Sequence, residues 1–458
     1  MGILSPAPYK PEIQDQEVVA KNYQYWRLRV FYSMFFGYAF YYFTRKSFTF
    51  AMPSLMADLN FDKASLGIVL SVWSIAYGLS KFISGIIGDR SNARYFMSLG
   101  LLATGICNIT FGLFSSLWMF VALWGVNGWF QGCGWPACAR LLTHWYSHSE
   151  RGRWWALWNT SHNIGGAIIP IVTAFFAQYY GWRVAMAVPG VISIVMALVL
   201  MNRLADTPQS LGLPAIEKFR NDYPSEEAKK EAAQGTEREL SVKEVLFTYV
   251  LNNPYIWLLS ISYFFVYIVR MAVGDWSALF FVESKQYTQI EASGIVVWYD
   301  IGGIFGSLAA GWASDKIFQG KRMPINVLFS FAMAATLFFF ATSGVKSLMI
   351  DSALIFTAGF FIYGPQMMIG MAAAELSHKK AAATASGFAG WMGYLGAAVA
   401  GWPIGKICHE YGWSGFFISM TACAVVAGLI LLPLWNVRSR EEKIFKPDEE
   451  VQEAEAVA

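Results

Sequence analysis

Long apolar runs separated by short polar loops dominate this chain. Each run is rich in Leu, Ile, Val, Phe and Ala, and is long enough to cross the roughly 30 Å hydrocarbon core of a bilayer as a helix. The pattern predicts an all-α polytopic membrane protein with 12 transmembrane helices. The predicted spans are residues 28–57, 65–88, 95–115, 117–142, 153–179, 182–203, 250–282, 290–314, 324–344, 349–374, 381–407 and 413–436.

A long polar segment separates the sixth span from the seventh. It contains Pro208, Pro214 and Pro224 and the charged run Glu226–Glu231, and we interpret it as a solvated connector between two six-helix halves. The predicted domains are an N-terminal segment at 1–27, the first half at 28–203, the connector at 204–249, the second half at 250–437 and an acidic tail at 438–458.

Lysine and arginine residues are concentrated in the loops on one side of the predicted bundle. By the positive-inside rule this side faces the cytoplasm, so both termini are predicted to be cytoplasmic. The opposite loops hold few cations, such as Lys63, Arg183 and Lys346. The lysine and arginine residues predicted to lie on the cytoplasmic side are Arg27, Arg29, Arg90, Arg94, Arg151, Arg153, Lys316, Lys321, Arg322, Lys379, Lys380, Arg438, Arg440 and Lys443.

The composition supports the membrane class and argues against others. Hydrophobic residues make up 56% of the chain and charged residues 14%, which is too apolar for an ordinary soluble protein. A net charge of +3 gives no indication of a basic surface that would bind nucleic acid. Residues 1–21 are polar and contain three prolines, so we expect no signal peptide, and the first span would direct insertion.

The chain offers no pattern of catalytic or metal-binding residues. Its cysteines lie in or beside apolar runs without metal-ligand spacing or a disulfide framework, and we interpret them as buried thiols. We therefore expect neither an enzyme nor a metal or cofactor site. The cysteines are Cys107, Cys133, Cys138, Cys408 and Cys423.

Three landmarks recur in the same order in both halves. Gly85-Ile-Ile-Gly-Asp89-Arg90 matches Gly311-Trp-Ala-Ser-Asp315-Lys316 after a shift of 226 residues, and Tyr180-Gly-Trp182 matches Tyr411-Gly-Trp413 after 231. Arg45 and Arg270 are 225 residues apart. Such a repeat predicts a pseudo-two-fold axis along the membrane normal, with the two arginines facing each other across it.

These arginines lie within apolar spans, where a cation costs at least ~2.5 kcal/mol on insertion scales. Arg45 is followed by Lys46, and both fall near the middle of the first span, as Arg270 does in the seventh. One such charge could belong to a structural ion pair, but its repetition favours a substrate path. A guanidinium binds phosphate or carboxylate in bidentate fashion, so two facing arginines would clamp a compact dianion.

Other polar side chains fall within the spans. Lys81 and His162 are further potential cations, and His162 could follow the second ionisation of a phosphate or simply join two helices by a hydrogen bond. Asp275 and Asp300 need partners, and Lys46 could supply one. If such pairs break when an anion captures the arginines, binding is coupled to motion of the halves; the alternative is a static salt bridge.

The paired Gly-x-x-x-Asp-Arg/Lys loops resemble those of the major facilitator superfamily, which implies that superfamily's fold and a gating role for Asp89, Arg90, Asp315 and Lys316. The chain also resembles the organophosphate:phosphate antiporter family within it, over residues 6–436. The stretches that carry this resemblance are 37–47 (GYAFYYFTRKS), 128–136 (GWFQGCGWP), 158–166 (WNTSHNIGG) and 206–214 (DTPQSLGLP). Residues 89–97, 138–143 and 154–159 are most similar to the UhpC-type hexose-phosphate proteins.

The resemblance implies that Arg45 and Arg270 bind phosphate with help from Lys81 and His162. It implies a charge network of Lys46, Asp275 and Asp300. It also places near the site Tyr38, Tyr42, Tyr77, Trp135, Asn159, Tyr267, Tyr363 and Tyr394.

The implied function is uptake of a glucose 6-phosphate-like hexose phosphate in exchange for inorganic phosphate. It would proceed by alternating access in a monomer of the bacterial inner membrane. The alternative is a membrane receptor that senses hexose phosphate and signals to a histidine kinase. Ser386 and Ala389 stand where hexose-phosphate carriers have an aspartate and a lysine, which leaves the choice of sugar open.

Overall fold

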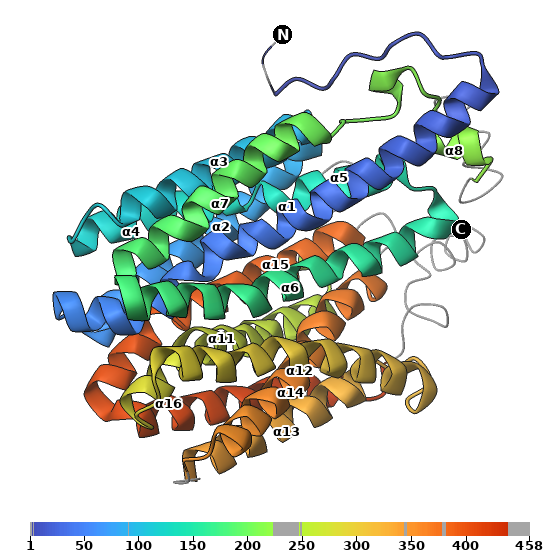
Figure 1. The fold of residues 1–458 in the computed structure, drawn as a ribbon. Coiled ribbons are helices and arrows are strands. Elements are labelled where there is room, and N and C mark those ends of the chain that lie inside the picture. Colours follow the sequence, from blue (N-terminus) through green and yellow to red (C-terminus); the bar gives the residue numbers. More distant parts are fainter. Residues whose placement is uncertain are drawn as a thin grey trace, which may run out of the picture.

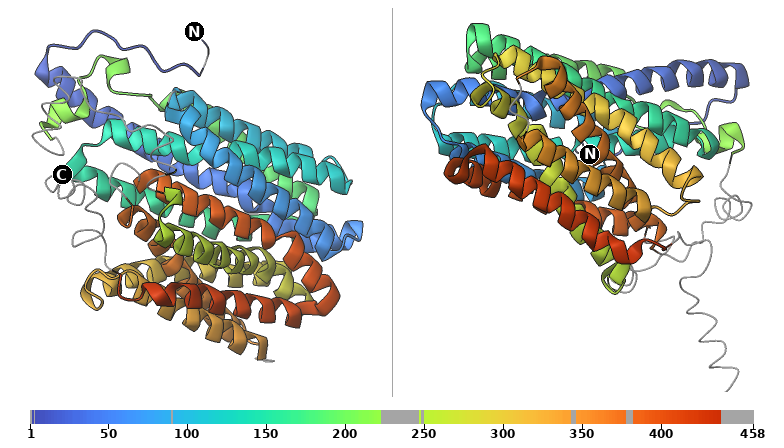
Figure 2. Two further views of the ribbon diagram at one scale, coloured as in Figure 1. Left: turned by 180° about the vertical axis from the view of Figure 1, so that it is seen from behind. Right: turned by 90° about the horizontal axis from the view of Figure 1, so that it is seen from below.

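The computed structural model describes residues 2, 4–89, 91–222, 247, 250–342, 346–377 and 382–437. The long helices of this part form two groups that lie side by side, α1 to α7 in one and α11 to α16 in the other (Figures 1 and 2). The groups meet where α1 contacts α11, α2 contacts α15 and α16, and α6 contacts α12. The predicted all-α fold with two helical halves is confirmed.

The helix bounds follow the predicted spans closely in most places. The first group contains α1 (Gln16–Leu59), α2 (Lys63–Asp89), α3 (Ala93–Phe111), α4 (Leu117–Gln131), α5 (Gly134–Trp145), α6 (His148–Tyr180) and α7 (Trp182–Arg203). The second contains α11 (Pro254–Glu283), α12 (Gln289–Lys316), α13 (Met323–Thr342), α14 (Leu348–Glu375), α15 (Ala382–Val399) and α16 (Trp402–Leu431), which has a kink at Gly412. Short pieces are η1 (Gln209–Leu211), α8 (Ile216–Arg220) and η4 (Leu432–Leu434).

Polar caps, rather than the ends of the apolar runs, set where several helices begin. The Asp15 side chain accepts hydrogen bonds from the backbone N–H groups of Glu17 (2.9 Å) and Val18 (3.2 Å), so α1 begins before the apolar run expected from residue 28. Asn253 caps α11 in the same way, and Pro254 at the first helical position explains a start later than residue 250.

Two predicted spans, 117–142 and 381–407, are each interrupted. The first breaks at Gly132 between α4 and α5, and the second breaks at Gly401 between α15 and α16. At both breaks the glycine lies so close to α2 that a Cβ atom would clash with it. A serine of α2 donates a hydrogen bond to a carbonyl just before each break: Ser80 to Trp129, and Ser71 to Ala398 (2.5 Å). The interruptions therefore depend on packing against α2, which the apolar pattern does not reveal.

The repeated Tyr-Gly-Trp landmark forms the same turn in both halves. Gly181 and Gly412 have φ of +83° and +65°, a region that side-chain-bearing residues rarely adopt. The indole of Trp182 donates to Asp58 (2.8 Å) at the end of α1, and that of Trp413 donates to Glu283 (3.1 Å) at the end of α11. The internal repeat thus extends from sequence to individual side-chain contacts.

This end of the bundle, which carries the Tyr-Gly-Trp turns, also holds contacts between the halves. Lys63 at the start of α2 forms a 2.7 Å ion pair with Glu283. The side chain of Gln289 at the start of α12 donates to the carbonyl of Phe50 in α1 (2.6 Å) and also contacts Ser54. These bonds close the space between the halves at this end.

The opposite end is organised by Asp206, the first residue of the DTPQSLGLP stretch. Its buried carboxylate accepts hydrogen bonds from the backbone of Ala7 (3.1 Å) and of Ala93 (3.0 Å), and pairs with Arg140 (3.2 Å). The backbone of Ile13 also donates to Gly212 (2.9 Å). The first part of the connector is therefore packed against the N-terminal half, which corrects the expectation of a solvated segment.

The prediction of buried thiols is confirmed for four of the five cysteines. Cys107, Cys133, Cys138 and Cys408 are buried and free, and Cys423 is half-buried and free.

The positive φ of the repeated turn predicts a stability effect. Gly412→Ala should lower the free energy of unfolding by about 1–3 kcal/mol, because alanine is strained at φ +65° and ψ −164°. Gly294→Ala is the control, since a Cβ there meets open space within α12 and alanine favours the helix. Thermal unfolding of the purified protein in detergent measures both, and an unchanged melting temperature for Gly412→Ala would contradict the assignment.

Candidate functional site

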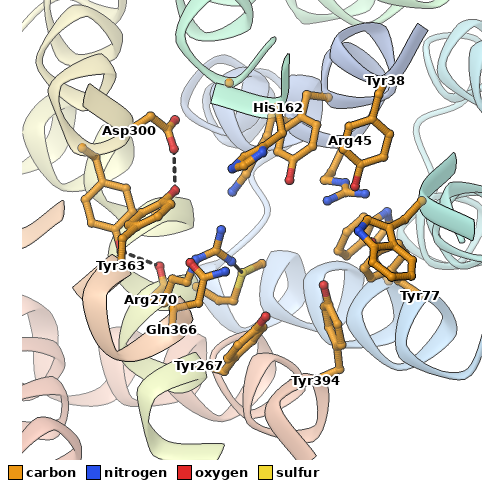
Figure 3. A pocket seen from close by; sticks show the side chains of 18 of the residues that line it. Tyr38, Arg45, Tyr77, His162, Tyr267, Arg270, Asp300, Tyr363, Gln366 and Tyr394 are labelled. Carbon is orange, nitrogen blue, oxygen red and sulfur yellow. Dashed lines mark hydrogen bonds between the residues drawn. The ribbon is translucent and has the colours of Figure 1, made fainter. Parts of the chain in front are cut away.

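A cavity of about 170 Å³ lies between the two halves, in the middle of the long helices. The structure brings all the side chains predicted to bind substrate to this one space, and Lys46 and Asp300 also line it. Figure 3 shows several of them directed at the cavity from both halves. The predicted binding residues that line it are Arg45, Arg270, Lys81, His162, Tyr38, Tyr42, Tyr77, Trp135, Asn159, Tyr267, Tyr363 and Tyr394.

Arg45 enters the cavity from α1 and is held by an aromatic and amide shell. Its guanidinium carbon lies 4.4 Å from the ring centre of Tyr42 and 4.6 Å from that of Tyr77. Its Nε donates to the side-chain oxygen of Gln131 (3.2 Å), while the amide nitrogen of Gln131 donates to Tyr41 O and Thr44 Oγ1, each at 3.0 Å. Gln131 therefore fixes the direction of Arg45 by using its whole amide group.

Arg270 enters from α11 on the other side of the cavity (Figure 3). Its guanidinium carbon lies 4.9 Å from the ring centre of Tyr363 and 5.6 Å from that of Tyr267. Each of the two arginines thus packs against two tyrosine faces. Cation–π contacts of this kind stabilise a desolvated cation by about 2 kcal/mol, which is less than the cost of removing the charge from water.

Neither guanidinium forms an ion pair with a carboxylate among the residues that the structure describes. Arg45 Nη2 and Arg270 Nε are buried without any hydrogen-bond partner in that part of the chain. A buried donor on a charged group that lacks an acceptor is costly. The arrangement is therefore suited to an anion that accepts hydrogen bonds from both sides.

Two further potential cations border the same space. Lys81 Nζ lies 5.5 Å from the ring centre of Trp135 and 5.4 Å from that of Tyr394. The imidazole of His162 lies 5.6 Å, centre to centre, from the ring of Tyr42. The cavity consequently combines positive charge with aromatic faces.

The charges near the arginines divide into two separate contacts. Lys46 Nζ pairs with Asp275 Oδ1 at 2.7 Å, and Thr49 Oγ1 donates to the same oxygen (3.1 Å). Asp300 instead accepts a hydrogen bond from the hydroxyl of Tyr363 (2.5 Å). Lys46 and Asp275 therefore join α1 to α11 across the halves, whereas Asp300 joins α12 to α14 within one half.

The predicted gating residues are only partly visible. Arg90 and the side chain of Asp89 lie outside the described residues, and Lys316 is exposed. Asp315 forms an ion pair with Arg322, which also binds Glu375 (3.0 Å). This network connects the ends of α12 and α14 to the loop before α13. Their gating role stays a prediction.

Several residues at the cavity were not predicted. Trp73 lies one helical turn before Tyr77, with its ring centre 5.5 Å from the Arg45 guanidinium carbon. Gln366 lies one turn after Tyr363, and Tyr299 donates to the backbone carbonyl of Arg270 (3.0 Å). For Trp73 and Gln366 the spacing from Tyr77 and Tyr363 was the available signal, because positions three or four apart share a helix face.

The two helical halves enclose a cavity that is lined by cations and lies midway along the helices. This arrangement is that of a membrane transporter, which moves its substrate through the space between its halves. A family model for the Major Facilitator Superfamily matches residues 34–401. The chain belongs to the major facilitator superfamily, a family of transporters and not of enzymes.

Known proteins similar to this chain support that membership. The "Probable hexose phosphate transport protein" of Chlamydia pneumoniae is 58% identical over 445 residues, which is 96% of this chain and 98% of that protein. The "Membrane sensor protein UhpC" of Escherichia coli (strain K12) is 47% identical over 432 residues, which is 94% of this chain and 97% of that one. The predicted resemblance to UhpC-type proteins is therefore confirmed.

Among solved structures, a bacterial homolog of the human lysosomal transporter Spinster, in an inward-facing and occupied conformation, has the same fold. It superposes with a TM-score of 0.69 at 16% identity, covering 92% of this chain and 99% of that one. This likeness supports the architecture alone.

The ion pair between Lys46 and Asp275 predicts a measurable coupling. Lys46→Met leaves the mostly buried carboxylate of Asp275 without its charge partner, whereas Lys46→Met combined with Asp275→Leu removes both charges. In a double-mutant cycle on thermal unfolding we expect a coupling of about 1–3 kcal/mol. The exposed pair Lys406–Glu410 is the control and should give about 0.3–0.5 kcal/mol. Strict additivity at Lys46 and Asp275 would contradict an energetic link between the halves there.

Proposed function

We propose that this chain is a bacterial plasma-membrane carrier that takes up a hexose phosphate of the glucose 6-phosphate class in exchange for inorganic phosphate. The observation that carries this proposal is the pair of buried arginines, one from each half, that line one cavity and each have a nitrogen without a hydrogen-bond partner among the described residues. The 58% identity to a protein named as a hexose phosphate transporter supports the substrate class.

The chemistry of the arginines favours a phosphate group over other anions. Each guanidinium presents a rigid fork of donors, and a phosphate offers several charged oxygens that can accept from two forks at once. Inorganic phosphate and a sugar phosphate share this group. Both anions therefore compete for one site, which is the basis of exchange.

The distribution of contacts between the halves supports alternating access. The cavity lies between the halves, and the Lys63–Glu283 pair and the Gln289 contacts close the end that carries the Tyr-Gly-Trp turns. Opening to that side requires these bonds to break. The Lys46–Asp275 pair lies beside the arginines and crosses the same boundary, so an anion at Arg45 alters the local field that holds this pair.

Occupancy of the cavity also explains why exchange is favoured over net movement. A halfway state with an empty cavity would enclose two unpaired cations away from water, at a cost of several kcal/mol. A bound divalent anion offsets that cost. The halves therefore rock readily only when phosphate or a sugar phosphate is bound.

Transport by the purified protein tests the proposal directly. Liposomes that contain the protein and are loaded with inorganic phosphate should accumulate labelled glucose 6-phosphate, and liposomes without internal phosphate should accumulate little. Protein-free liposomes give the background. Uptake that is equal with and without internal phosphate would contradict exchange.

The receptor alternative has one specific support, the 47% identity to a protein named as a membrane sensor. A receptor binds glucose 6-phosphate with the same cavity but signals to a kinase partner instead of completing the transport cycle. Saturable binding to the purified protein, together with no uptake in the liposome assay, would favour it over the carrier.

The fork geometry predicts that lysine cannot replace either arginine. Arg45→Lys and Arg270→Lys keep the charge but lose bidentate binding, and each should reduce phosphate exchange at least about a hundredfold. Arg203→Lys, at an exposed arginine in α7 that contacts Tyr32, is the matched control and should exchange at the wild-type rate. Labelled phosphate exchange in liposomes measures all three, and full exchange by either cavity variant would refute the clamp.

A further inference from the structure

The amide side chain of Gln366 has no part in the contacts that hold the two arginines. It lines the cavity from α14, and its side-chain oxygen is buried without a hydrogen-bond partner in the described part of the chain. Its backbone carbonyl accepts from the hydroxyl of Tyr263 (2.7 Å), which fixes this turn of α14 against α11. Figure 3 shows the Gln366 side chain beside Arg270 at the cavity.

Three other acceptors near the arginines have identified donors. Asp275 accepts from Lys46 and Thr49, Asp300 accepts from Tyr363, and the side-chain oxygen of Gln131 accepts from Arg45. The arginine and lysine side chains donate only. A phosphate, which mainly accepts, is served by these donors and has little need of a further acceptor.

Gln366 lies nearer the end of α14 than the tyrosine that packs against Arg270. It follows Tyr363 by three residues, and Tyr363 packs against Arg270. Lys81 follows Tyr77 by four residues, and Asn159 precedes His162 by three. Since α2 and α14 end, and α6 begins, at the end of the bundle that adjoins the connector, these three polar residues lie nearer that end than Tyr77, His162 and Tyr363 do.

An aromatic ring adjoins the group formed by Lys81, Asn159 and Gln366, because the ring of Trp135 lies beside Lys81. Amides next to an aromatic face suit a hydroxylated, non-aromatic ring, whose hydroxyl groups donate and accept while its C–H faces pack. An unpartnered acceptor in such a place is matched by a hydroxyl donor of a ligand.

We propose that Gln366 accepts a hydrogen bond from a hydroxyl group of the organic part of the transported organophosphate, and so distinguishes that substrate from inorganic phosphate. The inference rests on the proposed function and adds the orientation of the substrate: phosphate between the arginines, sugar toward the connector end. Gln366 is then a specificity residue for one of the two exchanged anions.

Equilibrium binding tests this without depending on transport. With the purified full-length protein in detergent, Gln366→Met should raise the Kd of glucose 6-phosphate about tenfold and change that of inorganic phosphate less than twofold. Asn326→Leu is the control: its amide is also buried and unpartnered within the described residues, but it lies in α13 away from the cavity. It should leave both values unchanged.

Monodeoxy analogues of glucose 6-phosphate sharpen the assignment. The analogue that lacks the contacted hydroxyl should bind the wild type about tenfold more weakly, and should lose nothing further in Gln366→Met. Gln366→Asn, which withdraws the amide by one methylene, offers the same comparison if the methionine variant does not fold.

The possible outcomes separate the inference from the proposed function. An equal loss for both anions, or no loss for either, would overturn the role of Gln366 while leaving the carrier intact. A wild type that binds inorganic phosphate but no hexose phosphate would overturn the proposed substrate and the inference with it. Selective loss in a protein that binds but does not transport would support Gln366 and count against the carrier.

Discussion

Two buried guanidinium groups share one cavity and form no ion pair with a carboxylate among the described residues, and the rest of the structure depends on this constraint. Arginine stays protonated at any physiological pH, so the protein cannot relieve this by losing a proton. It relieves part of it with tyrosine faces and with Gln131. The rest of the cost of burying the two charges is offset by a bound anion. The stability of the arrangement between the halves therefore depends on whether an anion is present.

The internal repeat makes the two halves similar. Contacts between the halves form where the halves differ. Each half contributes an arginine, a Tyr-Gly-Trp turn and an indole bonded to an acidic side chain at the end of its first helix. The acids are then used differently. Asp58 pairs with Arg183 of its own half, whereas Glu283 pairs with Lys63 of the other. A scaffold of equal halves thus carries an unequal set of bonds across its boundary.

The sequence predicted the helices and the arginine pair because both leave strong signals: long apolar runs are required in lipid, and a charge within one is rare. It did not reveal the breaks at Gly132 and Gly401, since these depend on close approach to α2. Nor could it assign a partner to Asp300 or single out Gln366, because polar residues within spans serve packing as well as binding. The start of α1 depends on a polar cap that an apolar pattern does not include.

The contacts of Asp206 have a consequence for biosynthesis. Ala7 near the start of the chain, Ala93 before α3 and Arg140 in α5 all bind this carboxylate, which follows α7. During translation the leading residues cannot take their final place until the ribosome has made the first seven helices. The N-terminal half can then be completed as a unit before α11 emerges, in keeping with the tendency of domains to fold in order of synthesis.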